Sequence, residues 1–251
     1  MTSVVQDVLI GLASSLLTFL CTVAGVWARR KIREKATHRA VREFFGLPGA
    51  ILVVHSAIFD ADEQAFNYPA TDTRAARALA QLFESVGLRE GVDFTVHPDR
   101  RVPLDDSTWS CNLVLLCGPA RNAVLAEIGP ALSMRYTMTA ETVGGRCRNV
   151  LTDHRRNERL RSSREGRTDI PPSGYDWGLV ASLPNPRNPA RRVVILAGIH
   201  GTGTVGAAEF VTDRSNLKLL NGRRRLATVS EVLRVDYGNG DIETPTSTEL
   251  A

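Results

Sequence analysis

The chain has 251 residues, 43% of them hydrophobic, which suffices for one sizeable domain or for one domain with appendages. Its four cysteines form no C-x-x-C pair, which excludes a disulfide framework and a cysteine zinc site and indicates a reducing compartment. The net charge of +4 is unevenly spread, because basic side chains gather in residues 29–43 and 146–167.

The first predicted element is a membrane span. Residues 8–28 contain no charged side chain, and about 20 predominantly apolar residues are needed to cross a bilayer. Trp27 suits the membrane interface, and Arg29, Arg30 and Lys31 follow it on the side that favours the cytoplasm. A cleaved signal peptide, the alternative, has its basic residues before the apolar run. We therefore expect a transmembrane anchor at 1–28, with the N-terminus outside and the domain that follows in the cytoplasm.

A basic juxtamembrane helix and linker is expected at 29–48. Its Lys and Arg side chains would contact the anionic headgroups of membrane lipid. Gly46, Pro48 and Gly49 break this helix. The sequence therefore predicts an α/β domain at 49–245 and a disordered tail at 246–251.

Within the domain, short apolar runs alternate with helical patterns. Strands are predicted at 50–58, 94–96, 113–116, 135–138, 148–151, 175–183 and 193–197. Helices are predicted at 71–87 and 122–128 and after Thr204, with Thr71 or Asp72 as the first cap. This alternation is typical of a mostly parallel, Rossmann-like sheet. Asn239-Gly240 additionally predicts a C-terminal β-hairpin, because Asn-Gly accepts the backbone angles of a tight turn.

One segment of the domain shows neither the periodicity of a helix nor that of a strand. Residues 153–173 are polar and rich in arginine, and they predict a long, mobile loop. A loop of this length in a compact domain is typical of a lid or a binding loop, or else of a disordered connection.

Two loops at strand ends are the candidate ligand site. Each follows an apolar strand and precedes a helix, so both are expected at the edge of a parallel sheet where ligands bind. Glycine lets a ligand approach the backbone, and the N–H groups at a helix start favour anions. The candidate ligand-binding residues are Gly118, Arg121, Asn122, Gly198, His200, Gly201, Thr202, Gly203 and Thr204. The alternative is that these glycines serve close packing of strand and helix.

The second loop lacks the P-loop pattern G-x-x-x-x-G-K-[ST], but Gly201, Gly203 and Gly206 follow G-x-G-x-x-G. Gly201, Gly203 and Thr204 also resemble the Gly-Gly-x-Gly-Thr-x-x-Glu signature of the SLOG-type Rossmann-like family. This resemblance implies a Rossmann-like domain that senses nucleotide-derived ligands. The glutamate of that signature is missing at its place, and Glu209 comes later.

Other kinds of chemistry have weaker signals. His200 could act with a loop carboxylate in catalysis, although no G-x-S-x-G elbow is present. The histidines have no metal-ligand spacing, so no metal site is expected. Few aromatic residues accompany the basic segments, which weighs against a nucleic-acid partner.

Three functions remain open at this point. The first is a membrane-anchored cytoplasmic receptor for a nucleotide-like or phosphorylated small molecule. The second is an anchored hydrolase or nucleotide-processing enzyme. The third is an interaction module that recruits a protein partner, or a second copy of the chain, to the membrane. No cofactor is identified.

Overall fold

The computed structural model describes residues 2–60, 65–143, 145–165, 167, 171–223, 228–239 and 241–248. The side chains of 2–17, 30, 33, 59, 60, 65, 66, 143 and 146 lie outside this description. The chain divides into two compact units, Met1–Arg39 and Ala40–Ala251.

A single helix, α1 (Thr2–Phe45), accounts for the first unit. Residues 8–17 of the predicted span belong to the part whose side chains are not described. In the described part of the chain, no helix is both long and apolar enough to cross a membrane.

The second unit begins at Ala40, earlier than the expected boundary at residue 49. The last turns of α1 belong to it because Val41, Phe44 and Phe45 are fully buried in its core. The expected tail at 246–251 contains a short strand, β13 (Thr246–Ser247), which pairs with β11.

The main sheet is mixed rather than mostly parallel. Its strands follow the order β12 (Asp241–Ile242), β11 (Val229–Gly238), β9 (Ser173–Asn185), β10 (Asn188–Gly198), β5 (Asn112–Leu116), β1 (Ile51–His55) and β4 (Phe94–Pro98). The last four run parallel, whereas β9, β11 and β12 pair antiparallel. β5 and the second half of β10, residues 193–198, read as continuous apolar runs because both of their faces are buried. The predicted C-terminal hairpin is confirmed by the pairing of β11 with β12.

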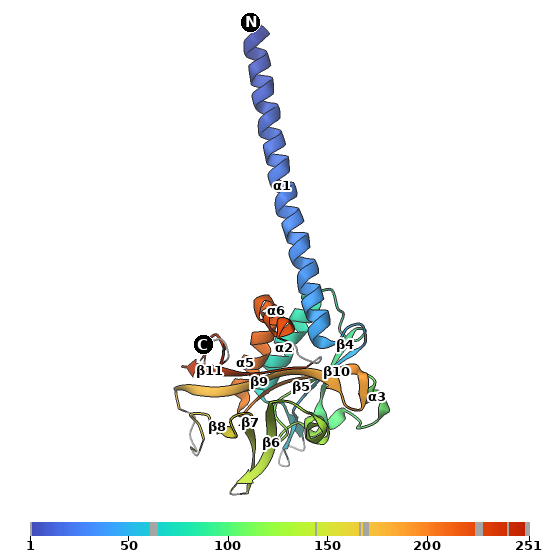
Figure 1. The fold of residues 1–251 in the computed structure, drawn as a ribbon, viewed down its shortest axis with the longest axis vertical. Helices are drawn as coiled ribbons and strands as arrows, with labels where there is room; N and C mark the ends of the chain where they lie inside the picture. Colours follow the sequence, from blue (N-terminus) through green and yellow to red (C-terminus); the bar gives the residue numbers. More distant parts are fainter. Residues whose placement is uncertain are drawn as a thin grey trace. The chain divides into compact units, whose positions relative to one another are not determined.

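Two layers cover the main sheet (Figure 1). On one face lie α2 (Ala70–Ser85), α5 (Gly201–Thr212) and α6 (Arg214–Gly222), which bury a core together with the end of α1. On the other face lie α4 (Ala123–Ile128) and a small sheet of β6 (Tyr136–Val143), β7 (Arg146–Asp153) and β8 (Glu158–Leu160), which bury a second core. The remaining turns are η1 (Asp99–Arg101), α3 (Asp106–Trp109) and η2 (Gly129–Ala131).

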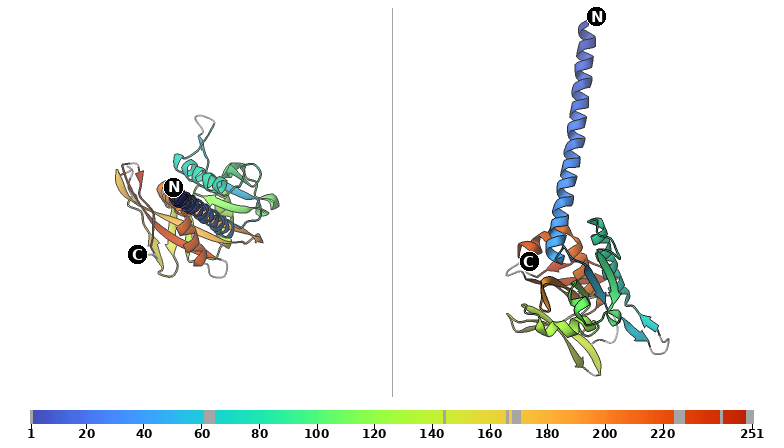
Figure 2. Two further views of the ribbon diagram at one scale, coloured as in Figure 1. Left: turned by 90° about the horizontal axis from the view of Figure 1, so that it is seen from above. Right: turned by 90° about the vertical axis from the view of Figure 1, so that its right-hand side faces the viewer.

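A two-stranded ribbon of β2 (Ile58–Asp60) and β3 (Ala65–Asn67) follows β1 and stands out from the sheet (Figure 2). It corrects the prediction of one strand over 50–58, which ends at His55 instead. The helix start at α2 also differs. Neither Thr71 nor Asp72 is its N-cap, because α2 begins at Ala70 and the Asp72 carboxyl accepts a hydrogen bond from Ser56.

The expected mobile loop at 153–173 is in part ordered structure. Its residues 158–160 form β8, which pairs with β7. Ser163 then bonds to the backbone N–H and carbonyl of Tyr175 on β9. These bonds fix the basic segment between the small sheet and the main sheet.

Candidate functional site

A cleft lies at the carboxyl ends of β1, β5 and β10. The strand order reverses here, because β4 lies on one side of β1 and β5 on the other. The cleft consists of two adjoining hollows. The larger, of about 510 Å³, is here named the arginine compartment, and the smaller, of about 280 Å³, the inner compartment. Both hollows share the side chains or backbone of Ala120, Arg121, Cys147, Arg148, Asn149, Arg164, Ile199 and His200.

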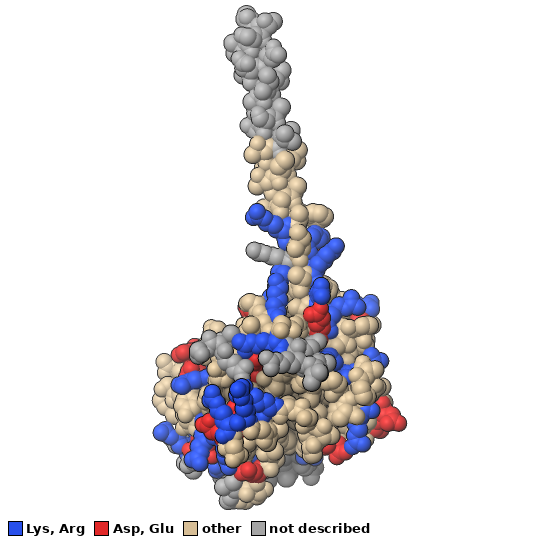
Figure 3. Space-filling view, viewed as in Figure 1, with Lys and Arg blue, Asp and Glu red and all other residues tan. Residues whose placement is uncertain are grey.

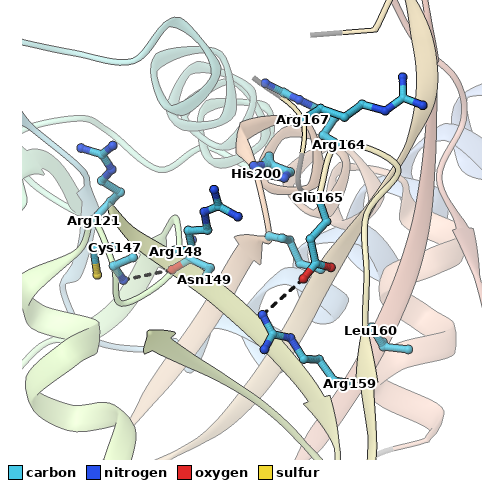
Figure 4. A pocket seen from close by; sticks show the side chains of 12 residues that line it. Arg121, Cys147, Arg148, Asn149, Arg159, Leu160, Arg164, Glu165, Arg167 and His200 are labelled. Carbon is cyan, nitrogen blue, oxygen red and sulfur yellow. Dashed lines mark hydrogen bonds and ion pairs between the residues drawn. The ribbon is translucent and has the colours of Figure 1, made fainter. Parts of the chain in front are cut away.

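Basic side chains dominate the arginine compartment. Arg121, Arg148, Arg164 and Arg167 line it, and none of them forms an ion pair with any residue that the structure describes. By contrast, Arg159 is paired with Glu141 at 3.1 Å and with Glu165 at 3.4 Å. In Figure 4, Arg121 and Arg148 stand on one side of His200, and Arg164 and Arg167 on the other. The compartment therefore carries a surplus of positive charge.

His200 lies between the two hollows with an unused ring nitrogen. Its Nε2 is buried and has no hydrogen-bond partner in the described part of the chain. Burial, together with the charges of Arg164 and Arg148, lowers the pKa of the imidazole from 6.5 to about 4. The ring is therefore neutral at pH 7 and offers one unsatisfied polar atom beside the arginines. A buried polar atom without a partner is costly, and a ligand would satisfy it.

The backbone of this loop is held by Asp176 of β9. Its carboxylate accepts the N–H groups of Gly203 at 2.7 Å, of Trp177 at 2.9 Å and of His200 at 3.1 Å. Burial raises the pKa of this carboxyl to about 7, against the effect of these three N–H donors. The start of α5 therefore already has an internal acceptor, and these N–H groups do not face a ligand.

Several of the predicted ligand residues are enclosed by the fold. Thr204 is fully buried, and its hydroxyl accepts the N–H of Gly198 at 3.0 Å. A Cβ on Gly203 would overlap the carbonyl of Trp177, and one on Gly198 would overlap the backbone of its own loop. The predicted contacts of Gly198, Gly203 and Thr204 with a ligand therefore gain no support, since close packing accounts for these residue types.

Asn122 and Gly118 also serve the fold. The Asn122 amide donates to the carbonyls of Val54 and Leu116, and its oxygen caps α4 by accepting the N–H of Leu125. All of these bonds are internal, so the predicted ligand contact of Asn122 gains no support either. Gly118 leaves room for the Asn149 side chain, which a Cβ would displace.

Arg121, His200 and Gly201 are the predicted residues that line the cleft. The loop position Thr202 is half-buried and lines neither hollow.

Sequence reasoning missed the contribution of the small sheet. Asn149 of β7 joins the two strand-end loops, because it accepts the N–H of Ala120 at 2.9 Å and donates to the carbonyl of Gly198 at 3.2 Å. The preceding Arg148 lines the cleft. The available signal was the excess of arginine over 146–167, which the sequence alone could not connect to the strand ends.

The inner compartment has a different lining. Ser56, Thr71 and Asp72 supply polar groups, and Ser56 donates a hydrogen bond to Asp72. Burial raises the pKa of the Asp72 carboxyl. Burial also raises the pKa of the Cys117 thiol to about 12, so this cysteine stays protonated. No group of three potential metal ligands occurs among the described residues.

No family model, no curated protein and no solved structure matches this chain. The resemblance of the glycine loop to the SLOG-type family therefore stays a prediction.

Proposed function

We propose that residues 40–251 form a receptor domain for a phosphate-bearing small molecule of nucleotide size, and that residues 8–28 anchor it on the cytoplasmic side of a membrane. One observation carries the first part: four arginines without acidic partners in the described chain surround the unsatisfied Nε2 of His200. Arginine forks match phosphate oxygens in geometry and charge. A neutral histidine ring can donate one more hydrogen bond to the same group.

The size of the cleft supports a small molecule. Hollows of about 510 and 280 Å³ together fall in the range typical of ligand pockets, which is about 300–1,000 Å³. The scaffold around them is already linked by Asn149 and Asp176, so ligand binding needs little rearrangement of the backbone.

The chemistry of the cleft supports binding more directly than catalysis. Cys117 is protonated, and no carboxylate is bonded to the His200 ring among the described residues. Neither group is therefore arranged as an activated nucleophile with its base.

The charge pattern of α1 supports the anchor. Phe19, Val26 and Trp27 are exposed apolar side chains in a stretch without charge. Figure 3 shows Lys and Arg side chains following this stretch along the helix. An uncharged run flanked by basic residues is typical of a span whose basic end faces the cytoplasm.

Calorimetric titration of the purified full-length chain with pyrophosphate tests the proposal. Arg148→Ala removes a charge-assisted hydrogen bond, worth about 1.5–3 kcal/mol, so affinity is expected to fall about tenfold to a hundredfold. The matched control is Arg77→Ala, which removes an exposed arginine of α2 outside the cleft.

Equal affinities of the two variants would contradict the proposed site. Hydrolysis of pyrophosphate or of a nucleotide by the native chain would favour the enzyme instead. Absence of anion binding, with a stable protein complex, would favour the interaction module.

A further inference from the structure

The two compartments of the cleft differ in chemistry as well as in size. Arg159 and Arg167 line only the arginine compartment, whereas Ser56, Thr71 and Asp72 line only the inner one. Arg121, Arg148 and Arg164 line both hollows, so the inner one is distinguished by the hydroxyl groups and the carboxyl group that it adds. A ligand that fills both must carry different groups at its two ends.

Asp72 is the main feature of the inner compartment. It is 1% exposed, and no ion pair links it to any described basic residue. Ser56 bonds to it through its hydroxyl and its backbone N–H, and Thr71 bonds to it through its hydroxyl, whereas a carboxylate can accept about four hydrogen bonds. The remaining acceptor position suits a ligand that brings a hydrogen-bond donor.

Two hydroxyl side chains flank this carboxyl group. Ser56 is the residue directly after β1, and Thr71 precedes Asp72 in the first turn of α2. A hydroxyl can both donate and accept. The set therefore matches neighbouring hydroxyl groups on a sugar, one donating to Asp72 and another bonding to Thr71.

Apolar groups complete the walls. Ile58, Pro69 and Ile199 line the inner compartment beside these polar groups. Apolar walls with a few placed polar groups are typical of small-molecule sites, and here they suit the carbon faces of a sugar ring.

We propose that the inner compartment binds the vicinal hydroxyls of a ribose whose 5-phosphate lies in the arginine compartment. The ligand class is a ribosyl phosphate, as in a ribonucleotide, and its orientation follows from the residues that the two compartments do not share, Arg167 in one and Asp72 in the other. This inference rests on the proposed phosphate site, because the arginines hold the other end of the ligand.

The test compares three probes on the full-length chain by calorimetry. Methyl ribofuranoside 5-phosphate carries both hydroxyls, its 2-deoxy analogue lacks one, and pyrophosphate has none. The ribosyl compound is expected to bind about tenfold more tightly than the deoxy compound, because the latter leaves a buried acceptor unsatisfied. These comparisons need no altered protein, so they hold even if a variant fails to fold.

Two variants locate the effect. Asp72→Asn exchanges an acceptor for a donor at constant shape, and Thr71→Val removes a hydroxyl while leaving the charge of Asp72. Each is expected to lower the ratio of ribosyl to deoxyribosyl affinity toward one. Thr73→Val is the matched control, because Thr73 lies exposed in the same turn and outside both hollows.

The outcomes separate the two proposals. Tight pyrophosphate binding without any preference for the ribosyl compound would overturn the ribose inference and leave the phosphate site standing. A preference that survives in both variants would overturn the assignment to Asp72 and Thr71. Absence of binding for all three probes would remove the phosphate site and the ribose inference together.

Discussion

At the scale of single residues, His200 connects the loop backbone to the cleft. Its backbone N–H donates a hydrogen bond to Asp176, and its ring lines the same hollow as the arginines. Because burial and the charges of Arg164 and Arg148 lower the pKa of this ring, the histidine adds no charge to the basic surplus at neutral pH. The neutral ring can instead form a directional hydrogen bond with a ligand.

The lowered pKa of His200 has a consequence for stability. Its pKa is about 4 in the folded chain and 6.5 in the unfolded chain, so the unfolded chain binds more protons between these values. The contribution of His200 to the free energy of unfolding therefore falls as pH drops from 6.5 to 4. His200→Gln removes this loss, so its stability relative to the native chain should rise over the same window.

Denaturant unfolding at several pH values measures the effect. His97→Gln, which replaces an exposed histidine of β4, is the matched control variant. A pH-independent stability difference between His200→Gln and the native chain would show that the ring is not shielded in the folded chain.

Two threonines of one loop make a matched pair. Thr204→Val leaves the buried N–H of Gly198 without an acceptor and should cost about 1–3 kcal/mol of stability. Thr202→Val removes a half-buried hydroxyl that bonds to no described residue, and it should change stability by less than about 0.5 kcal/mol. Similar urea midpoints for both variants would contradict the internal role of Thr204.

At the scale of elements, α5 depends on close approach to β9. Gly203→Ala would place a Cβ against the carbonyl of Trp177 and should cost about 1–3 kcal/mol through overpacking. Gly222→Ala is the control, since no atom lies within 4 Å of the added Cβ and alanine favours a helix. Thermal melting of both variants measures the difference. A Gly203→Ala chain that melts with the native chain would show that α5 can shift without penalty.

The sequence predicted those elements whose pattern is local. β5 and residues 193–197 of β10 are apolar runs buried on both faces, and α2 places Ala75, Leu79 and Phe83 on one buried side. The antiparallel direction of β9 was missed. Only Pro186 and Arg187 separate β9 from β10, and parallel neighbours need a much longer crossover, so a signal existed in the loop length.

The candidate site was only partly predictable. Arg121 and His200 follow apolar strands and do line the cleft. The enclosure of Asn122, Gly203 and Thr204 depends on partners that are distant in the sequence, such as Val54 and Asp176. No local pattern contains such pairings. The same is true of Arg148, which reaches the cleft from a separate sheet.

At the scale of the whole molecule, the proposed anchor makes a direct prediction. Phe19→Asp places a charge near the centre of the uncharged run, where it costs about 2.5–3.5 kcal/mol of insertion free energy. The variant should shift from the membrane fraction to the soluble fraction of a cell extract. Phe19→Leu keeps the apolar character and should stay with the membrane. Recovery of the native chain in the soluble fraction would overturn the anchor.

The place of β10 in the sheet also bears on how the chain is made. β10 lies between β5 and β9, yet it begins about seventy residues after the end of β5 in the chain. Synthesis proceeds from the N-terminus, so β5 leaves the ribosome with one edge unpaired until β10 arrives. An unpaired apolar edge invites pairing with other chains. The nascent chain is therefore most exposed to aggregation, and most in need of a chaperone, while residues 117–198 are being added.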